Sequence, residues 1–268
     1  MCGRYASSRR PEDLVEEFEV QQVDVREKLE PDYNVAPTKS VYAVLSRPPS
    51  SDRSAAPVRR LRALTWGLVP SWAKDPSIGN RMINARAETV AEKPAFRKAF
   101  ATRRCLLPAD GYYEWYPGEP QTPPGGAQGA KKRGQPRKQP FFIRPADGSV
   151  LAMAGLYEIW RDPALPRDDD GAFRWTCTII TTTAEDSLGR IHDRMPMLVE
   201  PKDYAAWLDP RRCEPDDLTA LGGLLVPAAP GRLEAYPVST AVNHVDNNGA
   251  ELVEPLVAEP DLLHDLEL

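Results

Sequence analysis

The residues best equipped for chemistry stand at the start of the chain, in the stretch Met1-Cys2-Gly3-Arg4-Tyr5-Ala6. If Met1 is trimmed, as expected before a small residue, Cys2 carries a free α-amine with a pKa of about 7.7–8.0 beside a thiol with a reference pKa of about 8.5. Such an amine can form a Schiff base with an aldehyde, and the thiol can close on the imine carbon to give a thiazolidine. The alternative is that Cys2 is merely the second residue of a chain.

Two later segments contain groups suited to proton transfer. The stretch Asp110–Tyr116 places Glu114 among four aromatic residues, and desolvation there would raise its carboxyl pKa toward that of a useful acid at pH 7. A strand with an outward-facing glutamate would look similar. His192 stands between an apolar residue and an Asp-Arg pair, which can orient an imidazole for proton transfer, although a lone histidine is more often structural or exposed.

Two more segments have both a plain and a functional interpretation. The stretch Met82–Thr89 is either a helix start with surface charge or a site in which Asn84 and Arg86 aim an amide and a guanidinium into a cleft. The stretch Trp66–Trp72 contains Gly, Pro and two tryptophans. Tryptophans of this kind are more often core residues than platforms on which nucleic-acid bases stack.

The elements that must position these groups are mostly strands. Runs of β-branched and aromatic residues predict strands at 41–45, 61–66, 104–107, 141–143, 150–160, 175–182 and 234–238. Helical spacing and early Pro or acidic residues predict helices from residue 11, over 94–101, near 183–187, around 204–207 and at 218–221.

Length and composition favour one large domain. The chain has 268 residues, of which 41% are hydrophobic, and this is enough for a substantial core. We expect a single domain over 1–256 with flexible charged inserts at 117–140 and 161–172, followed by an acidic tail at 257–268. A net charge of −5 does not indicate a nucleic-acid-binding protein, but a local basic groove is compatible with it.

The sequence also argues against a membrane protein, a secreted protein, a disulfide-linked protein and a metalloprotein. No apolar run approaches the roughly 20 residues of a membrane span, and no signal peptide is evident, so we expect a cytoplasmic protein. The four cysteines lack a CxxC pair and the three histidines lack an HExxH motif, so we expect neither a disulfide framework nor a metal. Cys105 and Cys177 lie in apolar runs and are expected to be buried packing residues.

Eight motifs occur along the chain in the order MCGRYA, YNVAPT, WGLVPSW, INARAET, DGYYEW, IHDRMP, VSTAVN and AELVEP. Together they resemble the SOS-response-associated peptidase family, whose members crosslink to abasic sites in single-stranded DNA. The resemblance covers residues 2 to about 256. It implies a mixed α+β fold, in which a distorted β-barrel-like sheet is flanked by helices, and it implies no cofactor.

The resemblance also implies roles for individual residues. Cys2 matches the crosslinking residue, Glu114 the acidic catalytic residue, His192 the histidine and Asn84 the active-site amide. Which of Glu114 and His192 serves each proton transfer stays open. The matching DNA contacts are Arg4, Arg86, Pro37, Trp72 and Thr181, with the arginines binding phosphates.

On this resemblance we expect a monomer that acts on abasic sites in single-stranded DNA during the SOS response and associates with the nucleoid when bound. Abasic-site lyase activity or reversal of the crosslink would use the same chemistry. Two other functions compete with crosslinking. A cysteine peptidase with autocatalytic N-terminal processing would need an oxyanion hole beside the sulfur, whereas a non-catalytic single-strand binder would be indifferent to Cys2.

Overall fold

The computed structural model describes residues 2–49, 52, 54–116, 138–169, 171–184, 188–224, 229 and 231–256. The acidic tail expected at 257–268 lies outside the described residues, as does the insert expected at 117–140 as far as residue 137. Residues 139 and 140 already belong to a strand. The second expected insert, 161–172, is the connection of a β-hairpin, across which the Asp162 backbone N–H donates to the Ala172 carbonyl at 2.8 Å.

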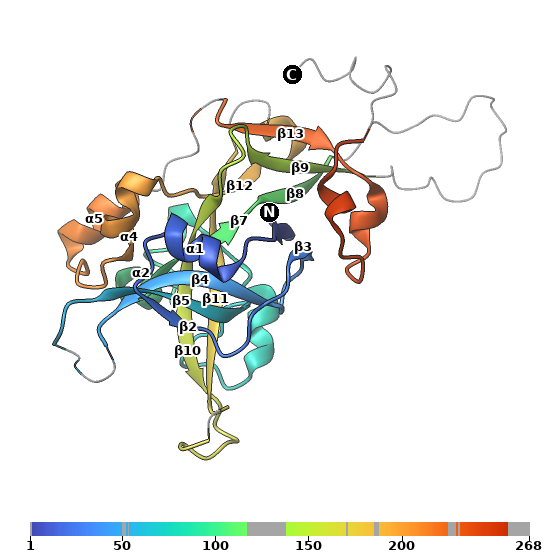
Figure 1. The fold of residues 1–268 in the computed structure, drawn as a ribbon. Helices are drawn as coiled ribbons and strands as arrows, with labels where there is room; N and C mark the ends of the chain where they lie inside the picture. The colour runs from blue at the N-terminus through green and yellow to red at the C-terminus, as the bar shows by residue number, and fades with distance from the viewer. Residues whose placement is uncertain are drawn as a thin grey trace, which may run out of the picture.

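A closed five-stranded barrel forms the centre of the molecule (Figure 1). Its strands are β4 (Ser40–Arg47), β5 (Val58–Trp66), β7 (Arg104–Ala109), β10 (Leu151–Arg161) and β11 (Phe173–Thr183). Antiparallel pairing joins β5, β4, β7, β10 and β11 in that order, and a parallel pairing of Cys177 with Trp66 closes the ring. The expected α+β fold with a barrel-like sheet is therefore confirmed.

Three short strands extend the barrel sheet. They are β2 (Gln22–Asp24), which runs parallel to β5, and β6 (Asn84–Arg86) and β12 (Arg194–Pro196), which both pair with β11. The interpretation of Met82–Thr89 as a helix start is wrong, because Asn84 to Arg86 form β6 and only a single 3-10 turn, Ala87–Thr89, follows. The backbone N–H and C=O groups of this segment are satisfied by hydrogen bonds to β11, whereas those of a helix would be satisfied within the helix.

A second, smaller sheet lies across one end of the barrel (Figure 1). Its antiparallel strands are, in order, β13 (Leu233–Pro237), β9 (Gln139–Pro145), β8 (Gly111–Tyr116), β1 (Tyr5–Ser7) and β3 (Asp32–Val35). Only Asp110 separates β7 from β8, so the chain passes directly from one sheet to the other. Gly111 permits this close crossing, since a Cβ there would lie 2.5 Å from the Phe142 ring and 2.6 Å from the Ile143 carbonyl oxygen.

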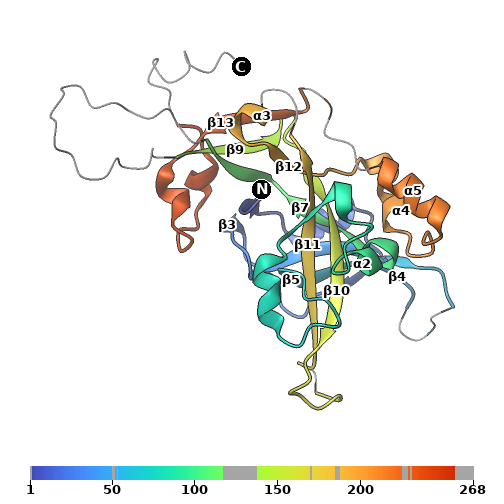
Figure 2. The same ribbon diagram turned by 180° about the vertical axis from the view of Figure 1, so that it is seen from behind.

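Helices α1 (Pro11–Glu17), α2 (Arg97–Thr102) and α4 (Tyr204–Leu208) cover the outside of the barrel, and α5 (Pro215–Gly223) lies beside α4 (Figure 2). Helix α3 (Leu188–Ile191) contacts β8 of the smaller sheet, and 3-10 helices occur at Pro76–Arg81, Ala87–Thr89, Pro201–Asp203, Thr240–Asn243 and Ala250–Val253. In α1, Pro11 at the first turn and two acidic residues behind it favour helix initiation. No helix among the described residues is long and apolar enough to cross a membrane.

Successive side chains along the barrel strands belong to two different hydrophobic clusters, one inside the barrel and one outside it. On β4, Ala43 and Leu45 belong to a cluster inside the barrel, whereas Tyr42 and Val44 belong to a cluster outside it that α1, α2 and α4 cover. Side chains of successive strand residues point to opposite faces, and because both faces are covered, β4 and β7 are buried at nearly every position. The inner cluster contains Cys105 and Cys177, as expected for packing residues, and it also reaches Cys2.

Candidate active site

The N-terminal strand places Cys2 where the smaller sheet meets the barrel. In the β1–β8 pairing Tyr5 faces Tyr112, and the backbone N–H of Tyr113 donates to the Arg4 carbonyl at 2.9 Å. Continuing this antiparallel register toward the N-terminus brings Cys2 alongside Glu114 and Trp115. The contact is thus fixed by backbone pairing between segments more than one hundred residues apart.

The Cys2 side chain is fully buried, with an exposed fraction of 0%. Burial raises the pKa of its thiol well above the usual value, and the charge of Glu114 raises it further, while the backbone N–H of Arg4 acts in the opposite direction. At neutral pH the sulfur is therefore held as a thiol, and a nearby base must take its proton before it can attack an electrophile.

Glu114 is the buried carboxyl of the site. The residue is 3% exposed and lies on the inner side of β8, so it is not the outward-facing glutamate of the alternative interpretation. Burial raises the pKa of the Glu114 carboxyl to about 7. A carboxyl with that pKa is present in both protonation states near neutrality, so it can give and take a proton under the same conditions.

His192 approaches Glu114 from the turn between α3 and β12. Its Nε2 lies 4.0 Å from the Glu114 Oε2, and its Nδ1 accepts a hydrogen bond of 3.0 Å from the backbone N–H of Arg194. The Asp193 carboxylate also lies 2.9 Å from Nδ1, but a nitrogen that accepts from Arg194 carries no proton to donate. Burial lowers the pKa of His192, so we assign the neutral ring with its proton on Nε2, facing Glu114.

Asn84 holds the Cys2 backbone from the barrel side. Its Nδ2 donates to the Cys2 carbonyl at 2.8 Å, while its buried Oδ1 has no hydrogen-bond partner within the described ranges. The position is fixed because Asn84 pairs with Ile179 on β11 and because the Trp66 indole N–H donates to the carbonyl of Ile83 at 2.9 Å. An acceptor left over beside Cys2 is suited to orienting an amine or a ligand N–H.

Comparison with known proteins identifies the family. A family model described as SOS response associated peptidase (SRAP) matches residues 1–245. The chain belongs to the SRAP family. It is 38% identical to the abasic site processing protein YoqW of Bacillus subtilis, over 95% of this chain and 99% of that protein. It is 34% identical to the abasic site processing protein YedK of Escherichia coli, over 96% of this chain and 100% of that protein.

Solved structures share the SRAP fold described above. A crystal structure of a protein from Bacteroides thetaiotaomicron superposes with a TM-score of 0.71 at 24% identity, and the match covers 96% of this chain and 100% of that one. A phage-related protein from Bordetella bronchiseptica superposes with a TM-score of 0.58 at 28% identity, over 88% of this chain and 94% of that one.

The expected DNA-contacting residues of this SRAP protein fall into two groups. Arg86 is exposed, and it pairs with Thr181 across β6 and β11, beside the Asn84 pairing that supports Cys2. Thr181 itself is only 1% exposed. Arg4 is half-buried and donates to the Asn34 Oδ1 at 2.5 Å and to the Val242 carbonyl at 2.8 Å, so internal partners fix the direction of its guanidinium.

Trp72 lies apart from this cluster, whereas Pro37 does not. Pro37 is half-buried in the turn between β3 and β4, two residues after Val35, which faces Tyr5 on the strand that follows Cys2. Trp72 is 60% exposed, and the carbonyl of its neighbour Ala73 accepts from the Trp160 indole at 2.7 Å. Trp160 stands five residues along β10 from Gly155, which pairs with Ile179 at the level of Asn84, and five strand residues span about 17 Å. The structure therefore does not bring Trp72 to the Cys2 cluster.

Three residues of the SRAP site were not singled out from the sequence. Arg194 donates to both Glu88 oxygens at 2.6 and 3.1 Å and to the Thr181 carbonyl at 2.5 Å, which fixes the turn that carries His192. The Tyr112 hydroxyl is buried without a hydrogen-bond partner in the described part of the chain, and burial together with the nearby Cys2 and Glu114 raises its pKa. All three lie within motifs of the family: Arg194 in IHDRMP, Glu88 in INARAET and Tyr112 in DGYYEW. Their positions in these motifs could have identified them from the sequence.

The site gives no indication of a bound metal ion. Among the residues that the structure describes, no three His, Cys, Asp or Glu side chains are arranged to hold one.

Proposed function

We propose that this protein processes abasic sites by linking Cys2, after removal of Met1, to the ring-opened aldehyde of an abasic site in single-stranded DNA. The observation that carries the proposal is the convergence of Cys2, Asn84, Glu114 and His192 from four separate elements. The relatives named abasic site processing proteins support the substrate class.

The proposed reaction needs only the aminothiol and the aldehyde. The lone pair of the Cys2 amine attacks the aldehyde carbon, and a proton passes from nitrogen to oxygen to give a carbinolamine. Protonation of its hydroxyl releases water and forms the C=N bond. The sulfur then adds to the same carbon, the π electrons return to nitrogen, and the thiol proton leaves to a base. The product is a thiazolidine with one secondary amine, and the balance is one water released.

Glu114 is the group best placed to move these protons. Its carboxylate form takes a proton from the amine or from the thiol, and its acid form delivers a proton to the departing hydroxyl. A pKa of about 7 makes both forms available during one turnover. His192 presents its Nε2–H toward the Glu114 carboxylate, 4.0 Å away, and in this scheme the dipole of that N–H group stabilises the charged form of the carboxyl.

DNA binding is proposed to follow the exposed side of this cluster. Arg86 would contact a phosphate beside the lesion, and Arg4 would add positive charge next to Cys2. Pro37, Trp72 and Thr181 remain proposed contacts. Since Thr181 is buried behind the Arg194 guanidinium, it would act through its neighbours on β11 and β6, and Trp72 would contact a more distant nucleotide by stacking.

The alternative of a cysteine peptidase finds less support. A peptidase nucleophile works as a thiolate of depressed pKa, whereas burial and Glu114 raise the pKa of Cys2. A thiol that waits protonated until its amine has formed an imine suits a two-step addition better than a direct attack on an amide.

Intact-mass spectrometry of the purified protein with and without an abasic oligonucleotide tests the proposal. We expect a protein lacking Met1 and, after incubation, an adduct equal to the oligonucleotide mass less one water. Cys2→Ala should lose the adduct, while Cys213→Ser, which changes a half-buried thiol elsewhere, should keep it. Retention of Met1 or acetylation of the amine in crosslinking protein would contradict the proposed chemistry. A non-catalytic binder would bind intact and abasic strands alike, whatever residue 2 is.

A further inference from the structure

The end of the barrel farthest from Cys2 has an unusual set of inward residues. Strand alternation places Arg47 on the same face as Ala43 and Leu45, and it places Arg60 and Arg62 on the same face as Leu64. Trp175 lies on the face of β11 that also carries Cys177 and Ile179. We call Arg47, Arg60, Arg62, Asp24 and Trp175 the arginine mouth.

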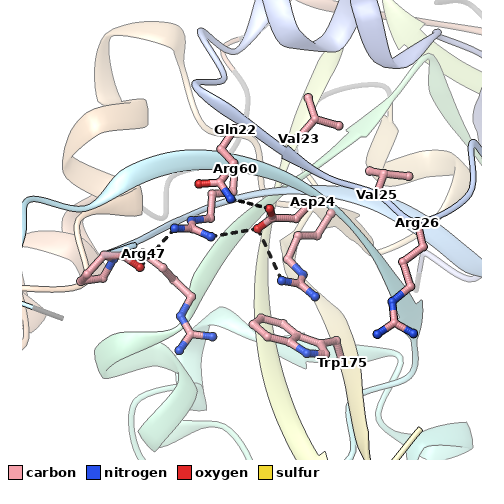
Figure 3. Close-up of a pocket in the computed structure, with 10 residues that line it drawn as sticks. Gln22, Val23, Asp24, Val25, Arg26, Arg47, Arg60 and Trp175 are labelled. Atoms are coloured by element: carbon pink, nitrogen blue, oxygen red, sulfur yellow. Dashed lines mark hydrogen bonds and ion pairs between the residues drawn. The ribbon is translucent and has the colours of Figure 1, made fainter. Parts of the chain in front are cut away.

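The Trp175 ring contacts two of the three guanidinium groups of the arginine mouth, in the cavity drawn in Figure 3. The Arg62 guanidinium lies 3.9 Å from the centroid of the Trp175 ring, and that of Arg47 lies 5.1 Å from it. Tyr157 stacks with Trp175 at 5.7 Å and an interplanar angle of 14°. A guanidinium held on an indole loses little side-chain freedom when it binds a ligand, so these groups are preorganised.

Positive charge in the arginine mouth exceeds the negative charge that faces it. Asp24 accepts from Arg60 at 3.0 Å and from Arg62 at 3.5 Å, and its other oxygen accepts from Gln22 at 2.7 Å. Arg47 makes no ion pair within the described part of the chain. One carboxylate therefore faces three arginines of the defined set, and Arg26 lines the same cavity as a fourth (Figure 3).

Buried donors in this region lack protein partners. Arg60 is 7% exposed, and its Nε and that of Arg62 are buried without a hydrogen-bond acceptor among the described residues. Burial and the neighbouring guanidinium groups of Arg47 and Arg60 lower the pKa of Arg62, although Asp24 opposes them. A cluster of like charges that stays desolvated is costly, and an anion bound between the arginines would offset that cost.

The cavity has the size of a small-molecule site. Its volume is about 490 Å³, and Pro48 and Val25 add apolar walls to the polar ones. Binding pockets for small molecules commonly span about 300–1,000 Å³. Planar guanidinium groups bind phosphate oxygens in pairs, and several of them around one cavity suit an anion with more than one charge.

We propose that the arginine mouth binds a phosphate anion, of the pyrophosphate or phosphate-monoester class, at the end of the barrel opposite Cys2. Arg47 and Arg62 supply the accessible guanidinium forks, Arg60 supports them from the buried side, and Asp24 fixes the orientation of Arg60 and Arg62. This site goes beyond the proposed function, since it uses none of the residues around Cys2.

Calorimetric titration of Cys2→Ala protein with inorganic pyrophosphate tests the site. The Cys2→Ala background cannot form the proposed crosslink, so failure of the crosslinking chemistry does not affect the result. We expect saturable one-to-one binding that weakens at least about tenfold in the variant R47Q/R62Q, which corresponds to about 1.4 kcal/mol. If R47Q/R62Q loses thermal stability, Arg47→Gln alone is titrated in its place. This change breaks no ion pair among the described residues, and it should also weaken pyrophosphate binding.

Two control variants locate the effect. Arg144→Gln alters an exposed arginine paired with Glu234 on the smaller sheet, and Arg211→Gln alters an exposed arginine paired with Asp209; both should leave pyrophosphate binding unchanged. Binding that is absent in the parent protein for both pyrophosphate and the phosphorylated strand described below, or that survives in R47Q/R62Q, would overturn the proposal.

A second titration distinguishes the source of the phosphate. A short single-stranded oligonucleotide with a 5′-phosphate is compared with the same strand lacking it, both without an abasic site. If pyrophosphate binds and the 5′-phosphate adds nothing, the ligand is a free anion. If the 5′-phosphate strengthens binding in a way that R47Q/R62Q removes, the site recognises a strand end.

Discussion

At the end of the barrel where Cys2 lies, the polar groups are a thiol, a carboxyl and an imidazole, whereas the opposite end carries arginines around Trp175. Both ends continue the same inner cluster, and both are partly withdrawn from water. The outcome of burial differs between them. Near Cys2 it raises the pKa of Glu114 to about 7, so the charge there changes with pH.

At the arginine mouth the same withdrawal from water leaves the charge in place. A guanidinium with a reference pKa above 12 stays protonated near neutrality even when its pKa falls. One barrel therefore holds two kinds of polar site. Burial moves the pKa of a carboxyl to about 7, so its charge changes near neutrality, whereas buried arginines keep their positive charge.

The largest effect we expect is on the rate of crosslinking in Glu114→Gln. The amide keeps the shape of the carboxyl but carries no transferable proton, so the rate should fall by about 10²–10³-fold. Crosslinking is measured by the yield of the shifted band over time. The matched control is Asp193→Asn, an exposed carboxylate beside the same histidine, which should change the rate less than about fivefold. Equal losses in both variants would mean that negative charge alone, and not proton transfer, matters here.

A smaller loss of rate is expected in His192→Asn. The asparagine oxygen can still accept from the Arg194 backbone, but no N–H then faces Glu114, so crosslinking should slow by about 10–100-fold. The pH profile of the rate should also move to higher pH, because the carboxylate loses the nearby N–H dipole that favours its charged form. His244→Asn, a change of an exposed histidine elsewhere, serves as the control. A normal rate in His192→Asn would reduce His192 to a residue that shapes the turn.

Glu114 should also make the stability of the protein depend on pH. Its folded pKa of about 7 lies above the unfolded value of 4.5, so its contribution is present below pH 4.5 and is lost as pH rises through 7. As the pH rises from 4.5 to 8, the free energy of unfolding of Glu114→Gln should therefore increase by about 1–3 kcal/mol relative to that of the parent protein. Urea unfolding at the two pH values measures this, and Asp193→Asn should show a change within about 0.5 kcal/mol. If the free energies of unfolding of Glu114→Gln and the parent protein differ by the same amount at both pH values, the pKa of Glu114 is not raised.

The smallest effect is expected from the arginine mouth on crosslinking. Because R47Q/R62Q lies at the other end of the barrel, the crosslinking rate should change less than about twofold, even where pyrophosphate binding is lost. The same time course on an abasic oligonucleotide without a terminal phosphate measures it. A crosslinking rate more than tenfold lower in R47Q/R62Q would mean that the two ends of the barrel act together in crosslinking.

Much of the fold could be predicted from local pattern. The strands at 41–45, 61–66 and 104–107 appear within β4, β5 and β7, because β-branched and aromatic residues suit a pleated sheet. The helix predicted over 94–101 appears as Arg97–Thr102. The segment around Asn84 was ambiguous because three residues of strand leave no periodicity to recognise, and only its neighbour β11 makes it a strand.

The candidate site was predicted less evenly. Cys2, Glu114 and His192 could be named from their sequence surroundings, since each type of side chain has its own chemistry. The parallel contact of β5 with β11 that closes the barrel could not be foreseen, because it joins residues more than one hundred positions apart. The same is true of Arg47, Arg62 and Trp175, which carry no local signal and meet only because the barrel closes.

The sequence by itself determined which chemical groups this protein has available: a cysteine at position 2, a carboxyl among aromatic residues, and a histidine beside an Asp-Arg pair. The tertiary structure alone decided their protonation states and their neighbours. The physical reason is that a pKa depends on how much water and charge surround a group, and here both are set by strands that are distant in the chain and adjacent in space.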